Sequence, residues 1–291
     1  MRFLFTAVSL SFLATPLLHA QQPMSDYLDV LIVKVRPEKR ADFDTVNRRI
    51  AEANRKAKGD SWIAMDVQYG EGNTVQIVSQ RQNFAAIDSG MTAFMSSIST
   101  AYGAGGVAKM MADFNSTILS SRSEIRRRRW DLTVNPPTDA DSYSKIIGSA
   151  RWARTFRVTV RNGREDDFEQ RAKEVKTALE KGSKWTFFIS EVIAGTPGNV
   201  YYITTLQPSL AAYDSAPKLD ELMGKEAFEG WRKAVSEDQV TSETTMLRLM
   251  PELSNAPEGV VKVAPDFWLP KHVASAPHTT PKLADTAKAA R

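Results

Sequence analysis

Two copies of one pattern follow each other along this chain. Residues 33–36 (VKVR) return as residues 158–161 (VTVR), and Trp62 returns as Trp185, in each case with a glycine three positions earlier. The matches keep the same order through both copies with only small changes in spacing, which chance coincidence does not produce. A repeat of this length indicates one folded unit that is present twice.

Each copy has the periodicity of alternating strands and helices. In the first copy, alternation of apolar and polar residues predicts a strand over residues 29–36, and apolar residues at helical spacing predict a helix from residue 43 to 53. Two strands around Gly70-Glu71-Gly72 predict a hairpin, a helical region follows from residue 84 to about 114, and a closing strand covers residues 124–132. The second copy repeats this order, so the predicted fold class is α+β, with a ferredoxin-like β-α-β-β-α-β module in tandem.

A module of this kind covers only one face of its sheet with helices. The other face is apolar enough that it would not remain exposed on a monomer, so we expect the two modules to pack sheet to sheet. The element order and the repeat make the chain similar to the dimeric α+β-barrel superfamily over residues 28–132 and 153–250. That superfamily includes antibiotic-biosynthesis-type monooxygenases and stress-responsive barrel proteins. The resemblance implies an intramolecular pseudo-dimer, as a monomer or within a homo-oligomer.

The N-terminus is typical of a signal peptide. Met1-Arg2 precedes a mostly apolar stretch that ends at Leu18, and Ala20 stands before a polar segment. We therefore expect a signal peptide over residues 1–20, cleavage after Ala20, and an exported protein that is periplasmic or secreted. The alternative, a membrane anchor, is disfavoured because the apolar run is short and interrupted by polar residues. No later segment is apolar enough to cross a bilayer, so we expect no membrane attachment after cleavage.

Composition changes mark the remaining boundaries. The first module is predicted over residues 28–132, a linker over 133–152, the second module over 153–253 and a flexible tail over 254–291. The linker contains Asn135-Pro136-Pro137 and many small polar residues. The tail is rich in proline, alanine, lysine and threonine, although residues 267–269 (FWL) could dock onto the barrel.

The residue types present exclude several kinds of site. The chain has no cysteine, which excludes disulfides, thiolate metal sites and cysteine nucleophiles. Its three histidines, His19, His272 and His278, lie outside both modules, which argues against a histidine-ligated haem or a zinc site. The net charge of +4 reflects a mixed surface, and we expect no nucleic-acid partner, no metal and no cofactor.

Three short patterns have plain structural interpretations. Arginines 126–129 lie on a predicted strand, so they alternate between its faces, and we interpret the run as a solvated or locally paired edge strand instead of a polyanion site. Ser142 and Lys145 match a Ser-x-x-Lys motif, but the motif falls in the linker and lacks its partner motifs. The glycines within residues 103–106 are interpreted as a helix interruption.

A ligand site is expected in the space between the two sheets. Alternation along the strands directs a set of aromatic, amide and charged side chains into this space, a composition typical of a small-molecule pocket. The predicted ligand-binding residues are Lys34, Trp62, Asp66, Gln76, Arg157, Trp185, Glu191 and Tyr202. The alternative is that these side chains only fill the interface between the sheets.

Two functions follow from this site. The first is an exported barrel protein that binds a small, partly apolar molecule or acts as a structural interaction module. The alternative is a cofactor-independent monooxygenase or isomerase that acts on a small aromatic compound, as the resemblance implies. A closed, dry interface favours a structural role, whereas a cavity of about 300 Å³ lined by Trp62 or Trp185 favours binding or catalysis.

Overall fold

A computed structural model of the chain describes residues 25–269. The predicted signal peptide and the end of the predicted tail therefore lie outside the described residues. The first half contains β1 (Tyr27–Val35), α1 (Arg40–Ala57), β2 (Ile63–Tyr69), β3 (Thr74–Arg81), α2 (Ala85–Ser116) and β4 (Ile118–Arg128). The second half contains β5 (Trp152–Val160), α4 (Glu165–Gly182), β6 (Phe188–Ala194), β7 (Asn199–Gln207), α5 (Leu219–Met223), α6 (Lys225–Asp238) and β8 (Gln239–Leu249). Between and after the halves lie α3 (Ala140–Ser149), α7 (Glu258–Val263) and α8 (Pro265–Trp268).

All eight strands join in one closed barrel. Their order around it is β1-β3-β2-β8-β5-β7-β6-β4. Within each half the strands have the ferredoxin-like order, and the halves join where β2 pairs with β8 and β4 pairs with β6, both antiparallel. This confirms the predicted fold class, two ferredoxin-like modules that form an intramolecular α+β barrel. The prediction of an edge strand at residues 126–129 is wrong, because β4 is hydrogen-bonded on both sides.

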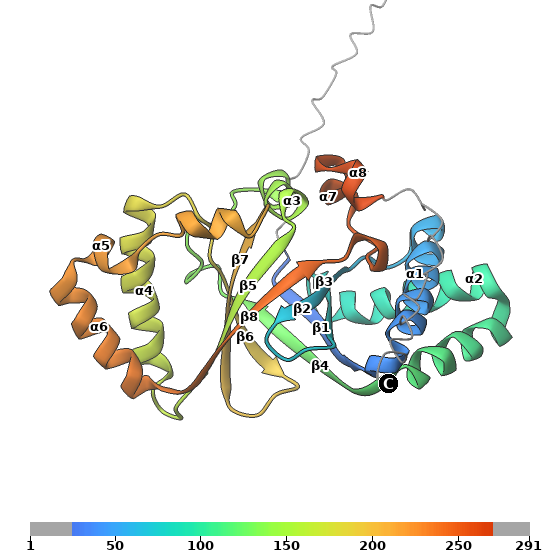
Figure 1. Ribbon diagram of the computed structural model, residues 1–291, viewed down its shortest axis with the longest axis horizontal. Coiled ribbons are helices and arrows are strands. Elements are labelled where there is room, and N and C mark those ends of the chain that lie inside the picture. The colour runs from blue at the N-terminus through green and yellow to red at the C-terminus, as the bar shows by residue number, and fades with distance from the viewer. Residues whose placement is uncertain (1–24, 270–291) are drawn as a thin grey trace, which may run out of the picture.

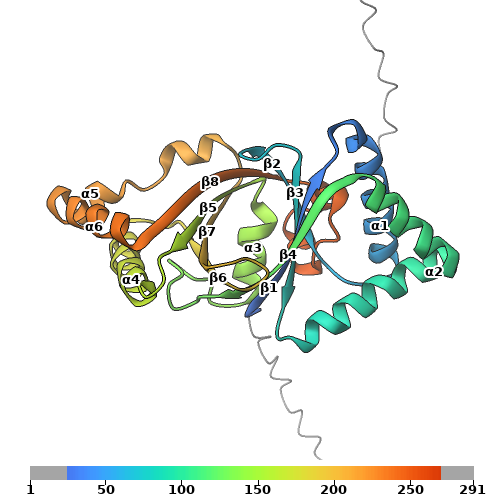
Figure 2. The same ribbon diagram turned by 90° about the horizontal axis from the view of Figure 1, so that it is seen from below.

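Two groups of helices cover the outside of the barrel on opposite sides (Figure 1). Helices α1 and α2 lie against the sheet of the first half, and α4, α5 and α6 lie beyond the sheet of the second half (Figure 1). The view from below shows the strands between these two groups of helices (Figure 2). The first core consists of side chains from β1 and β3, such as Val33 and Val75, packed with Phe43 of α1 and Ile98 of α2. No helix within residues 25–269 is long and apolar enough to span a membrane.

Helix α2 is interrupted where the sequence predicts it. Gly103 has φ 71° and ψ 172°, a conformation that glycine tolerates better than other residues. The break turns the second part of the helix back toward the sheet, so that Phe114 packs against Phe43 with ring centroids 5.8 Å apart.

The predicted linker and tail contain ordered helices. Helix α3 begins with a capping box, in which the Asp139 side chain accepts a hydrogen bond from the Ser142 amide at 2.7 Å and the Ser142 hydroxyl accepts one from the Asp139 amide. Ser142 of the Ser-x-x-Lys pattern therefore caps a helix. The tail was predicted to be flexible from residue 254, but α7 and α8 lie in it, and Trp268 is only 1% exposed. Its indole nitrogen donates a hydrogen bond to the Gly148 carbonyl of α3 at 3.0 Å, so α8 docks onto α3.

Removal of the Trp268 side chain tests whether this C-terminal segment is part of the cooperative fold. Because the ring is buried among α3 and barrel residues, Trp268→Ala should lower the free energy of unfolding by about 3–5 kcal/mol. Leu269→Ala is the matched control, since Leu269 is 43% exposed and should change stability little. Urea denaturation of both variants measures the difference, and equal stabilities would contradict the docked position of α8.

Candidate functional site

The candidate site is a cavity between the sheet of the first half and helices α1 and α2. Its volume is about 280 Å³. We call it the helix–sheet cavity. Its apolar lining consists of Leu31, Ile50, Trp62, Ile77, Met91, Phe94, Met95, Met111 and Phe114. Its polar lining consists of Asp29, Asn47, Asp60, Ser79, Arg81 and Ser123.

Trp62 forms the aromatic wall of this cavity. It is buried and packs edge-on against Phe94 of α2, with ring centroids 5.8 Å apart. Its indole nitrogen donates a hydrogen bond to the Leu253 carbonyl at 2.7 Å, and its backbone pairs with Asn255. The residues that follow β8 therefore fix the ring of Trp62, and one edge of the cavity depends on the C-terminal part of the chain.

A buried ion pair forms the polar end of the cavity. Arg81, only 7% exposed, donates two hydrogen bonds to Asp60, at 2.6 and 2.7 Å, and lies 3.4 Å from Asp29. Burial acts to lower the pKa of Arg81, but the hydrogen bonds to Asp60 and the charges of both carboxylates outweigh it and raise that pKa. Two carboxylates face one guanidinium, so this end carries a net negative charge and is suited to a ligand that donates hydrogen bonds.

The cavity is partly adaptable in shape. Three methionines line it, and a methionine side chain fills irregular space at low energetic cost because it is unbranched and flexible. Met91 is 58% exposed and Ser123 is exposed, so both lie at the opening of the cavity to solvent. A ligand can therefore enter between α2 and β4.

The second half has different side chains at the matching positions. Its tryptophan, Trp185, packs against Phe187 and Tyr213, with ring centroids 6.2 and 5.6 Å apart. The guanidinium of Arg154 lies 5.1 Å from the ring centroids of both Phe156 and Tyr213. In the first half, Tyr27 of β1 lies opposite Arg81 of β3. At the matching position of the second half, Trp152 of β5 lies opposite Gln207 of β7. The two halves have therefore diverged: at these positions the first half places two carboxylates around a buried arginine, whereas the second half has Gln207 in place of that arginine.

Four predicted site residues lie on the inner face of the barrel. Gln76 lines a cavity in the barrel interior, which we call the lumen. Tyr202 pairs with Ser190, another residue of that cavity, and with Arg157 on β5, so both lie on the same face. Lys34 alternates with Val33 and Val35 of the first core, and it forms an ion pair with Glu71 at 2.9 Å.

The inward direction predicted for the other four residues is wrong. Trp62 lines the helix–sheet cavity, and Asp66 forms an ion pair with Arg40 at 2.8 Å on the helix side. Trp185 packs against Tyr213, and Glu191 pairs with Arg127 outside the barrel. The reason is the hairpin register: Met65 lies opposite Gln76 and Asp66 opposite Val75, so Asp66 and Gln76 point to opposite faces.

Sequence analysis also missed residues of both cavities. Arg126 and Arg128 line the lumen cavity, and their alternation on a strand was the available signal. Tyr143 and Ile147 reach the same cavity from α3, a helix that was not predicted. No local pattern in the sequence joins Asp60 to Arg81, because the contact arises only when β2 and β3 pair.

Comparisons with known proteins find similarity in structure alone. No protein-family profile matches the chain, and no curated protein matches it in sequence. Among solved structures, a candidate monooxygenase from Lactobacillus acidophilus is 11% identical with a TM-score of 0.48, over 77% of this chain and 94% of that one. A candidate monooxygenase from Fusobacterium nucleatum is 9% identical with a TM-score of 0.49, over 78% and 94%. A haem-binding protein from Thermus thermophilus is 10% identical with a TM-score of 0.42, over 80% and 96%.

A glycine substitution tests how closely α2 packs on the polar end of the cavity. A Cβ atom added at Gly90 would lie 2.6–2.8 Å from the guanidinium of Arg81, which its carboxylate partners hold in place. Gly90→Ala should therefore destabilise the protein by about 1–3 kcal/mol. A Cβ atom added at Gly105, also in α2, would have no atom within 4 Å, so Gly105→Ala should stabilise the protein by up to about 1 kcal/mol. Thermal and urea unfolding measure both, and a similar effect of the two substitutions would contradict the packing described.

Proposed function

We propose that this protein binds a small, mainly apolar molecule in the helix–sheet cavity of its first half. The observation that carries the proposal is a cavity of about 280 Å³ with an aromatic and methionine lining and a charged end formed by Arg81, Asp60 and Asp29. Ligand pockets in proteins are mostly apolar, with a few polar groups that fix the orientation of the ligand. The Trp62 wall and the cluster of Arg81 with its two carboxylates have these two roles.

The size and charge of the cavity restrict the ligand. Pockets for drug-sized molecules have volumes of about 300–1,000 Å³, so this cavity suits a molecule of one or two rings. Asp60 is occupied by Arg81, but Asp29 lies at 3.4 Å from it and can accept a further hydrogen bond. A ring that carries a hydroxyl group therefore fits best, with the ring against Trp62 and Phe94 and the hydroxyl donating to Asp29.

Titration with 1-naphthol tests this proposal, with calorimetry as the measurement. The wild type should bind one equivalent saturably. Trp62→Phe removes part of the aromatic wall and should raise the Kd about three- to tenfold. Trp185→Phe makes the same change at the equivalent position of the second half and should leave the Kd unchanged. Absence of saturable binding to the wild type, or equal effects of the two substitutions, would rule out the helix–sheet cavity as the binding site for this ligand class.

Oxygen uptake in the same samples separates binding from turnover. Consumption of oxygen with phenols that falls in Trp62→Phe would extend the function to cofactor-independent oxygenation. If the wild type consumes none with any phenol tested, cofactor-independent oxygenation of this ligand class is ruled out.

We also propose that the protein is exported, because residues 1–20 have the composition of a signal peptide. The mature chain should then begin at Gln21, since Ala20 is the small residue at which cleavage is expected. Intact-mass measurement of protein isolated from the producing cells checks this. A chain that retains residues 1–20 would contradict export by cleavage.

A further inference from the structure

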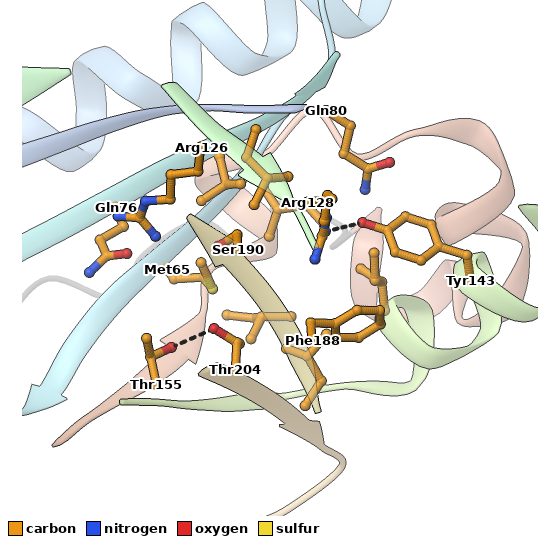
Figure 3. A pocket seen from close by; sticks show the side chains of 16 residues that line it. Met65, Gln76, Gln80, Arg126, Arg128, Tyr143, Thr155, Phe188, Ser190 and Thr204 are labelled. Atoms are coloured by element: carbon orange, nitrogen blue, oxygen red, sulfur yellow. Dashed lines mark hydrogen bonds between the residues drawn. The ribbon is translucent and has the colours of Figure 1, made fainter. Parts of the chain in front are cut away.

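A second cavity lies inside the barrel, apart from the helix–sheet cavity. Its volume is about 90 Å³, roughly three times the share of one water molecule in the liquid, about 30 Å³. Figure 3 shows side chains from several strands and from α3 around this space, including Gln76, Arg126, Arg128, Tyr143, Ser190 and Thr204. Tyr143 and Ile147 of α3 close one end of the lumen.

The charges that line this cavity are not balanced. Two arginines line it, whereas its lining residues include no carboxylate. Arg126 is 4% exposed and has its own partner, because its Nε donates to Glu124 at 2.8 Å and its guanidinium stacks 3.5 Å from the ring centroid of Tyr202. Burial raises the pKa of Glu124, but Arg126 and the Thr196 hydroxyl outweigh it and lower that pKa, so Glu124 stays ionised. Arg126 is therefore paired with Glu124, which also forms an ion pair with Arg122 at 3.1 Å.

Arg128 has no such partner. Within residues 25–269, no carboxylate forms an ion pair with it. Its Nη2 donates to the Tyr143 hydroxyl, its guanidinium lies 5.0–5.5 Å from the ring centroids of Phe188, Trp130 and Tyr143, and its Nε is buried without a hydrogen-bond partner. Aromatic rings and a neutral hydroxyl compensate this partly buried cation only in part. Arg128 thus leaves one positive charge beside the cavity and one hydrogen-bond donor, its Nε, without a partner.

From this geometry we infer that the barrel lumen binds a short-chain monocarboxylate of about two to four carbon atoms. The carboxylate would pair with Arg128, since the planar guanidinium matches two carboxylate oxygens, and the Ser190 and Thr204 hydroxyls lie around the same space. The hydrocarbon end would contact Phe188, Leu206 and Leu249, which belong to the larger, apolar part of the lining. This apolar part disfavours an inorganic polyanion, whose outer oxygens would have no donors there.

Propionate is the probe for this inference. It replaces chloride in the buffer while the ionic strength is kept constant. Thermal unfolding and calorimetry should show that propionate stabilises and binds the wild type beyond the effect of chloride. Propionamide has nearly the same shape without the charge and should not bind. This comparison uses only the wild-type protein, so it decides the proposal even if a lumen variant fails to fold.

Two arginine variants locate the site. Arg128→Met removes the lumen charge and should raise the Kd for propionate at least about tenfold. Arg127→Met removes the same charge from the next residue, whose side chain is 50% exposed and pairs with Glu191 outside the barrel, and should leave the Kd unchanged. Equal binding by Arg128→Met and Arg127→Met, or a wild-type response to propionate no larger than to chloride or propionamide, would overturn the inference. Binding of 1-naphthol in the helix–sheet cavity is measured separately, so the two sites can fail independently.

Discussion

Closure of the barrel depends on two antiparallel seams, between β2 and β8 and between β4 and β6. Each half alone would leave both of its outer strands with unpaired backbone groups, and each would expose the inner face of its sheet. The seams satisfy these groups and create the lumen at the same time. Arg126 and Arg128, which line the lumen, pair with Val192 and Ser190 of β6 across one seam, so the lumen around them forms only because the halves are joined.

Local periodicity was sufficient to predict the elements of the two modules and their order. Alternation in β1 and the apolar stripe from Phe43 to Ala53 depend only on neighbouring residues, and Gly103 marks the break in α2 by its own conformational freedom. The faces of β2 and β6 were not predictable in this way. Which residue of β2 lies opposite Gln76 is set by the turn and by the partner strand, and an error of one position reverses every side chain.

The contacts of the candidate site were also not predictable from local periodicity. Trp62 was identified as a pocket residue, but the cavity that it lines is on the other side of the sheet. Asp60 and Arg81 are ordinary surface residue types in the sequence, and only the pairing of β2 with β3 buries them together. Helix α3 was hidden by a polar, proline-containing stretch, although the capping box at Asp139 and Ser142 was a readable start signal. The scaffold therefore follows from local pattern, whereas the faces of β2 and β6 and the pairing of Asp60 with Arg81 depend on contacts between distant segments.

The two halves have the same fold but different side chains at matching positions. In the first half a buried arginine with two carboxylates closes a cavity, whereas in the second half Arg154 and Tyr213 lie together beside Trp185. Closure of the barrel requires only the strands of both halves. The side chains that line the cavity in one copy therefore need not be kept in the other.

The bond between the Trp62 indole and the Leu253 carbonyl joins residues 191 positions apart in the chain. A contact of this separation forms late in folding, because a long loop has to close before the contact can contribute any stability. During synthesis, the first half leaves the ribosome long before β8 and the segment that fixes Trp62. The aromatic wall of the helix–sheet cavity is therefore completed only when the segment after β8 arrives, so a chain that ends before β8 has most of the residues of the cavity but not its final shape.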